Sequence, residues 1–149
     1  LHIGYPDRTE EKAIVRRVAT GARAPVDSVV TVEEIAQART DIEAVRLEDD
    51  ILDYIVELTF ATREPEEYGL SDIAGLIEYG ASPRATIFLT RASRARAFLR
   101  GRDYVMPDDV KAMALQVMRH RLRTTYEADA RGVDSDDIVR RVLEAVPAP

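Results

Sequence analysis

Apolar side chains recur at intervals of three and four residues through almost the whole chain, and this is the period of an α-helix rather than of a strand. The clearest helical stretch covers residues 82–101. Ser82 is a favourable N-cap, and Pro83 suits the first helical position because no N–H is needed there. Gly101 is a favourable residue just beyond the last turn. We expect the buried face of this helix to consist of Phe88, Ala92, Ala95 and Leu99.

The same period predicts five further helices. They begin near Asp7, after Thr31, near Glu48, at Pro107 and near Ser135. Asp7 is followed three residues later by Glu10, which is the spacing of a capping box. We therefore predict an all-α bundle of about six helices. Residues 65–83 are expected to form a long loop with room for one short turn of helix, and a short extended segment is expected near residues 121–126.

Composition excludes several kinds of site and location. The chain has no cysteine and two histidines, which argues against a thiolate or histidine metal site. No apolar run approaches the length of about 18–20 residues that a membrane-spanning helix needs, and no signal peptide is visible. We expect a cytoplasmic protein with no metal site and no contact with a membrane.

Charge is distributed unevenly along the chain. Residues 1–82 hold 8 basic and 18 acidic side chains, a net of −10, whereas residues 83–124 hold 10 basic and 3 acidic side chains, a net of +7. The basic segment either pairs with the acidic part of the chain or faces a phosphate-bearing ligand. The overall charge of −6 makes nucleic acid an unlikely ligand.

One cation stands at an unfavourable place in its helix. The start of a helix is electropositive, yet Arg84 follows directly after Pro83 in the first turn. Its planar fork suits phosphate oxygens, and the unpaired N–H groups of a helix start bind anions. The predicted anion-binding residues are Ser82, Pro83, Arg84 and Arg91, the last being seven residues beyond Arg84. The alternative is that Arg84 pairs with a carboxylate of residues 1–82.

The other charged clusters have simpler explanations. We expect Arg94 and Arg96 to lie on a solvated face. The basic residues of MRHRLR suit the end of a helix, and the acidic pairs, including Asp108 and Asp109, suit helix starts. The chain contains no phosphate-binding loop, hydrolase elbow, zinc signature or Rossmann glycine pattern. The residues therefore do not make a complete active site.

Several motifs together carry a resemblance to one family. The longest is YGASPRATIFLTRASRARAFLRGRDYVMPDDVKAMALQVMRHRL, and it is supported by HIGYPDRTEE, LEDDILDYIVELTFATR and VPAP. In this order and spacing they resemble the C-terminal helical lid of MoxR-family AAA+ ATPases. The resemblance extends over nearly all of the chain.

The resemblance implies a division of the chain and a role for Arg84. Residues 1–6 would be a remnant of the exit strand of an ATPase core, and residues 7–149 would be the lid. The Walker A and B motifs would lie upstream, so we expect no ATP hydrolysis and no cofactor in these residues alone. ATP and Mg²⁺ would be bound mainly by the core. Arg84 matches the sensor 2 arginine, which contacts the γ-phosphate within one subunit or across a subunit boundary.

The resemblance also implies partners. These are the protein's own AAA+ core, neighbouring subunits of a hexamer, and a client carrying a von Willebrand factor A domain, on which the ATPase acts in a chaperone-like manner. The sequence departs from the family pattern at Met106, which replaces a Ser or Thr and removes a helix cap worth about 1 kcal/mol. Asp108 and Asp109 are expected to compensate in part.

A second function remains open at this stage. Residues 83–124 would also serve a stand-alone helical module that binds DNA or protein through its basic side chains. The net negative charge of the chain and the absence of aromatic residues interleaved with basic ones count against it.

Overall fold

The computed structural model describes residues 4–21 and 26–149, which form two compact units, Leu1–Ala36 and Gln37–Pro149. Within the first unit, α1 (Arg8–Ala19) has the predicted capping box. The Asp7 carboxylate accepts from the Glu10 N–H at 2.8 Å, and the Glu10 carboxylate accepts from the Asp7 N–H at 2.9 Å. The predicted strand at residues 1–6 lies partly outside the described residues, and residues 4–6 are not in a strand.

The described residues contain eight α-helices and one 3₁₀ helix, which confirms the predicted all-α class. The six predicted helices correspond to α1, α2 (Val32–Ala44), α3 (Asp49–Ala61), α5 (Pro83–Leu99), α6 (Pro107–Met118) and α8 (Ser135–Ala145). Of the two short helices, α4 (Ser71–Ala74) corresponds to the short helical turn expected within the loop, and α7 (Tyr126–Ala130) was not predicted. Each has five residues or fewer, which is too short to show a helical period.

A small antiparallel sheet joins two segments that are far apart in the sequence. β1 (Ile77–Tyr79) pairs with β2 (Arg123–Thr124), with Ile77 opposite Thr124. β2 confirms the extended segment expected near residues 121–126. The region expected to be a long loop contains η1 (Pro65–Tyr68), α4 and β1.

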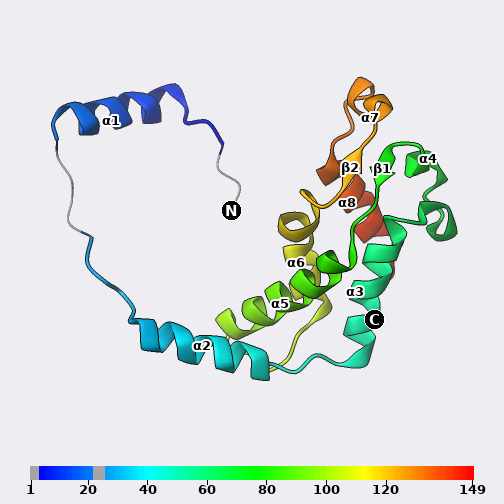
Figure 1. The fold of residues 1–149 in the computed structure, drawn as a ribbon, viewed down its shortest axis with the longest axis horizontal. Coiled ribbons are helices and arrows are strands. Elements are labelled where there is room, and N and C mark those ends of the chain that lie inside the picture. The colour runs from blue at the N-terminus through cyan, green and yellow to red at the C-terminus, as the bar shows by residue number, and fades with distance from the viewer. Residues whose placement is uncertain (1–3, 22–25) are drawn as a thin grey trace. The chain divides into compact units, whose positions relative to one another are not determined.

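The core of the second unit lies among α3, α5, α6 and α8. Its largest fully buried side chains include Ile55, Leu58, Leu89, Met118 and Ile138. α5 contacts both α3 and α6, and Figure 1 shows α5 and α6 side by side. This packing places the first turn of α5 beside the last turn of α3.

The buried face of α5 differs from the predicted one. The structure buries Ala85, Leu89, Ser93 and Ala97, which are spaced by four residues. The predicted residues Phe88 and Leu99 are instead 43% and 80% exposed. Three of these four side chains are small, which lets neighbouring helices approach closely, so the packed face is selected by size as well as by hydrophobicity.

Candidate functional site

The first turn of α5 leaves an arginine free for a ligand. Ser82 is the N-cap, with extended backbone angles of −75° and 167°, but its hydroxyl makes no capping hydrogen bond. Ser82, Pro83, Arg84 and Arg91 are all exposed. Within the second unit, Gln37–Pro149, no carboxylate pairs with Arg84 or Arg91. The alternative pairing of Arg84 with an acid is therefore absent for the acids of residues 37–82.

A glycine allows the loop before α5 to lie against the end of α3. A Cβ placed on Gly80 would lie 2.5 Å from the Thr62 carbonyl oxygen and 2.9 Å from the Arg63 Cα. Both are backbone atoms, which have little freedom to move aside. Only a glycine at this position therefore allows the observed approach of the two segments.

Hydrogen bonds hold the loop in this position from both sides of residue 81. The Ala81 N–H donates to the Thr62 hydroxyl at 2.9 Å, and the Arg63 Nε donates to the Ala81 carbonyl at 2.6 Å. Ala81 and Thr62 are fully buried. The position of Arg84, three residues later, is therefore set by the end of α3.

Buried hydroxyl groups extend this connection into both helices. The Thr62 hydroxyl donates to the Thr59 carbonyl at 2.7 Å, and the Thr59 hydroxyl donates to the Ile55 carbonyl at 3.1 Å. The Thr86 hydroxyl, in the first turn of α5, donates to the Thr59 hydroxyl at 3.1 Å. A continuous polar chain thus joins the last turns of α3 to the start of α5.

The opposite end of α5 is connected to α6 by a buried carboxylate. Asp109 is 2% exposed and accepts from both terminal nitrogens of Arg102 at 2.7 Å. Arg96 Nε lies 3.5 Å from the same carboxylate. Asp109 also accepts from the Met106 N–H at 2.9 Å, which supplies part of the cap that Met106 itself cannot make.

Burial alone would raise the pKa of Asp109, but the hydrogen bonds from Arg102 and from the Met106 N–H outweigh it, so the pKa lies below its ordinary value. The expectation that Arg96 lies on a solvated face is wrong because it contacts this buried carboxylate. Arg94 is half-buried, and its Nε is enclosed without a partner in the described structure.

Ion pairs account for fewer than half of the cations in residues 83–124. Arg96 and Arg102 share Asp109, Arg119 pairs with Asp136 at 3.0 Å, and Arg123 pairs with Glu78 at 2.8 Å. No carboxylate of residues 37–149 pairs with the others, which are Arg84, Arg91, Arg94, Arg100, Lys111 and Arg121. Pairing with the acids of this unit therefore does not explain the basic segment.

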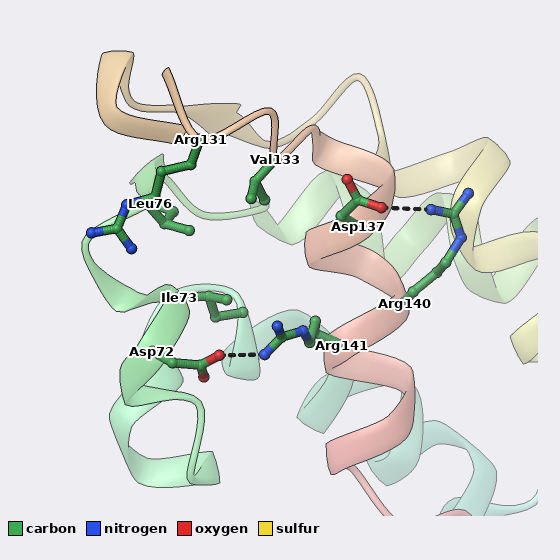
Figure 2. A pocket seen from close by; sticks show the side chains of 8 residues that line it. All are labelled: Asp72, Ile73, Leu76, Arg131, Val133, Asp137, Arg140 and Arg141. Atoms are coloured by element: carbon green, nitrogen blue, oxygen red, sulfur yellow. Dashed lines mark hydrogen bonds and ion pairs between the residues drawn. The ribbon is translucent and has the colours of Figure 1, made fainter. Parts of the chain in front are cut away.

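A separate cavity of about 440 Å³ opens between α4, α7 and α8. Ile73 and Leu76 contribute apolar side chains to its lining. Figure 2 shows Arg141 directed at Asp72 and Arg140 directed at Asp137. Each of these arginines has a carboxylate partner. The cavity therefore offers an anion less free positive charge than the start of α5 does.

The described residues offer neither a metal site nor a membrane-spanning helix. No cluster of three or more histidine or acidic side chains is arranged to hold a metal ion. No helix in the same residues combines the length and apolar character needed to cross a membrane.

Sequence reasoning found Arg84 but missed the residues that place it. The available signal was Gly80, two residues before the N-cap, because helix capping itself requires no glycine there. Thr59 and Thr62 gave no comparable signal, because a threonine in a helix is most often exposed. Their roles depend on contacts between residues 19 and 27 positions apart, which no local pattern shows.

Comparison with known proteins relates the chain to one group. A family model described as "AAA lid domain" matches residues 71–142. Chaperone MoxR1 of Mycobacterium tuberculosis is 35% identical over 158 residues, which cover all of this chain and 39% of the relative. Protein MoxR of Methylorubrum extorquens is 41% identical over 128 residues, which cover 81% of this chain and 37% of the relative. The chain thus spans about two fifths of the length of these curated relatives.

A solved structure agrees with these relatives. The crystal structure of a candidate ATPase from Cytophaga hutchinsonii superposes with a TM-score of 0.88 at 38% sequence identity. The match covers all of this chain and 46% of that one. The similarity in sequence and the similarity in fold therefore both relate the chain to ATPases of this group.

Proposed function

The chain carries the AAA lid domain of the MoxR-type ATPase family, and from this premise we propose that it is the sensor 2 lid of an ATP-hydrolysing, chaperone-like protein. In this proposal Arg84 contacts the terminal phosphate of ATP. The observation that carries it is that Arg84 is exposed and has no carboxylate partner within residues 37–149, while Gly80, Thr62 and Arg63 fix the start of its helix.

The residues present fit a phosphate group. A guanidinium makes two parallel, charge-assisted hydrogen bonds to phosphate oxygens, and a helix start without a side-chain cap leaves N–H groups for the same anion. Arg84 would stabilise the negative charge that develops as the terminal phosphoryl group is transferred to water. It forms no bond to phosphorus and moves no proton.

The remaining parts of the site are assigned to a nucleotide-binding core. Residues 1–6 would be the exit from that core, and residues 7–149 would be the lid. The core would bind most of the ATP together with Mg²⁺, so the lid alone would not hydrolyse ATP. Assembly into a hexamer, a client with a von Willebrand factor A domain and a cytoplasmic location belong to the same proposal.

The test compares two arginines of one helix in the full-length protein. Arg84→Ala is expected to lower kcat for ATP hydrolysis about 100-fold, the loss typical of removing one group that stabilises transition-state charge. Its thermal midpoint should match that of the unmodified protein, because Arg84 has no carboxylate partner to lose. Arg100→Ala is the matched control, since Arg100 is also exposed and unpaired in the described structure but lies at the other end of α5. Equal hydrolysis rates in the two variants would refute the sensor assignment.

The second candidate function is a stand-alone nucleic-acid-binding module, and the six unpaired cations of residues 83–124 are the observation in its favour. Such a module would bind duplex DNA with an affinity that falls steeply as salt increases. A titration at low and physiological salt separates the two proposals. Tight binding at physiological salt would favour the module, and its absence would favour the lid.

A further inference from the structure

Arg121 lies just beyond the end of α6 and stacks on an aromatic ring of α5. Its guanidinium carbon is 4.6 Å from the centroid of the Phe88 ring. Its Nε is enclosed, with no hydrogen-bond partner in the described structure. The ring therefore supports the guanidinium from one side through a cation–π contact, while no carboxylate of residues 37–149 neutralises its charge.

The neighbouring arginines of the same motif behave differently. Arg119 donates to the Leu115 carbonyl and pairs with Asp136, and Arg123 pairs with Glu78. Within the second unit, residues 37–149, no carboxylate pairs with Arg121. Helix-end preference explains cations in this region as a group, but it does not explain why this one is held on a ring and left without an acid.

Arg121 lies at the same end of the α5–α6 pair as Arg84. Asp109 at the start of α6 contacts Arg96 near the end of α5, so the two helices are antiparallel. The residues after α6 therefore return to the first half of α5, where Phe88 is located. Phe88 follows Arg84 by one turn, and helical side chains lean toward the N-terminus, so its ring leans toward the turn that carries Arg84.

We propose that Arg121 is a second residue that binds the phosphates of the nucleoside triphosphate, with Phe88 as the positioning residue that orients its guanidinium. The inference rests on the proposed function, since it places Arg121 at the anion that Arg84 contacts. Two guanidinium groups near one polyphosphate favour the nucleotide with the greater negative charge. ATP has one more phosphate than ADP, so the second arginine increases the affinity for ATP more than the affinity for ADP. Arg121 thus contributes to discrimination between ATP and ADP.

The test measures nucleotide affinity in the full-length protein, separately from hydrolysis. Dissociation constants for ATP and ADP are determined by equilibrium titration for Arg121→Ala, Arg121→Lys, Arg84→Ala and the control Arg123→Ala. The control removes a cation of the same motif whose partner is exposed Glu78. Arg121→Ala is expected to weaken ATP binding about tenfold and ADP binding less than twofold. Arg121→Lys should restore part of the loss, because it keeps the charge without the planar fork.

Phe88→Leu tests the positioning role. It keeps an apolar side chain and both arginines but removes the ring, so it is expected to reduce ATP affinity in the same direction as Arg121→Ala and by a smaller factor. ATP affinity unchanged in Phe88→Leu would overturn the positioning assignment.

The outcomes separate this inference from the proposed function. If Arg84→Ala impairs hydrolysis while Arg121→Ala binds ATP and ADP like Arg123→Ala, the inference is wrong and the sensor assignment stands. If Arg84→Ala changes neither nucleotide binding nor hydrolysis, the proposed function is wrong, and the inference that rests on it is wrong as well. An equal loss of ATP and ADP affinity in Arg121→Ala, together with a lower thermal midpoint, would show a structural role and also overturn the inference.

Discussion

Replacing Gly80 with alanine tests whether the close approach of the loop to α3 sets the position of Arg84. The added Cβ would lie 2.5 Å from the Thr62 carbonyl oxygen and 2.8 Å from the Thr62 carbonyl carbon. Ordinary contacts of this kind are about 3.4 Å or longer, so the loop must move by about 1 Å. That movement would stretch both hydrogen bonds of Ala81, from its N–H to Thr62 and from Arg63 to its carbonyl.

The magnitude follows from these contacts. Inserting one methyl group into a well-packed site costs about 1–3 kcal/mol. For a unit of this size, each kcal/mol lowers the thermal midpoint by roughly 4 °C, so we expect a decrease of about 4–12 °C. ATP hydrolysis by the full-length protein should also fall, because a displacement of about 1 Å in a charge-stabilising group costs up to 100-fold in rate.

Gly75→Ala is the matched control. Gly75 has backbone angles of −71° and −6°, which alanine adopts readily, and no atom lies within 4 Å of a Cβ placed there. Its thermal midpoint should stay the same or rise slightly, since alanine restricts the unfolded chain more than glycine does. Differential scanning calorimetry measures both variants. Equal midpoints for Gly80→Ala and Gly75→Ala would refute the reasoning.

Two further predictions concern the buried polar contacts. Thr62→Val removes the acceptor of the buried Ala81 N–H and should lower the free energy of unfolding, measured by urea titration, by about 1–3 kcal/mol. Thr62→Ser keeps the hydroxyl acceptor and should retain most of this stability. Asp109→Asn should cost about 3 kcal/mol at neutral pH, because it breaks a buried ion pair. The pKa of Asp109 is lower in the folded state, so its stabilising contribution is complete above its unfolded pKa of about 3.9 and is lost as the pH falls through the folded value. The difference in free energy of unfolding between Asp109→Asn and the unmodified protein should therefore be constant from pH 7 to 5 and become smaller below about pH 4. A difference that does not change with pH would contradict this.

The long helices were predictable because their starts and stops have local signals. Pro83 and Pro107 stand at first helical positions, and the Asp7 capping box was visible in the spacing. The buried face of α5 was not predictable from hydrophobicity, since Ala85 and Ser93 are buried while Phe88 is half exposed. Which face of α5 is buried depends on how closely α3 and α6 pack against it, and this depends on the sequences of all three helices.

The candidate site was also predictable only in part. The first-turn position of Arg84 can be inferred from Pro83 and Ser82 alone, and the family resemblance supplied its expected role. The contacts of Gly80 with Thr62, and of Arg121 with Phe88, join residues 18 and 33 positions apart. Neither pair has a spacing that a helix or strand would reveal, so they required the structure.

The attachment of α5 at both ends has a mechanical consequence. Its first turn is hydrogen-bonded to α3 through Thr86 and the preceding loop, and its last turns contact Asp109 of α6. A helix of 17 residues fixed in this way is a stiff lever about 25 Å long. A rotation of about 10° around the Arg84 end would carry the opposite end through about 4 Å. A small rotation at the Arg84 end would therefore become a translation of several ångströms at the Asp109 end, where α5 contacts α6.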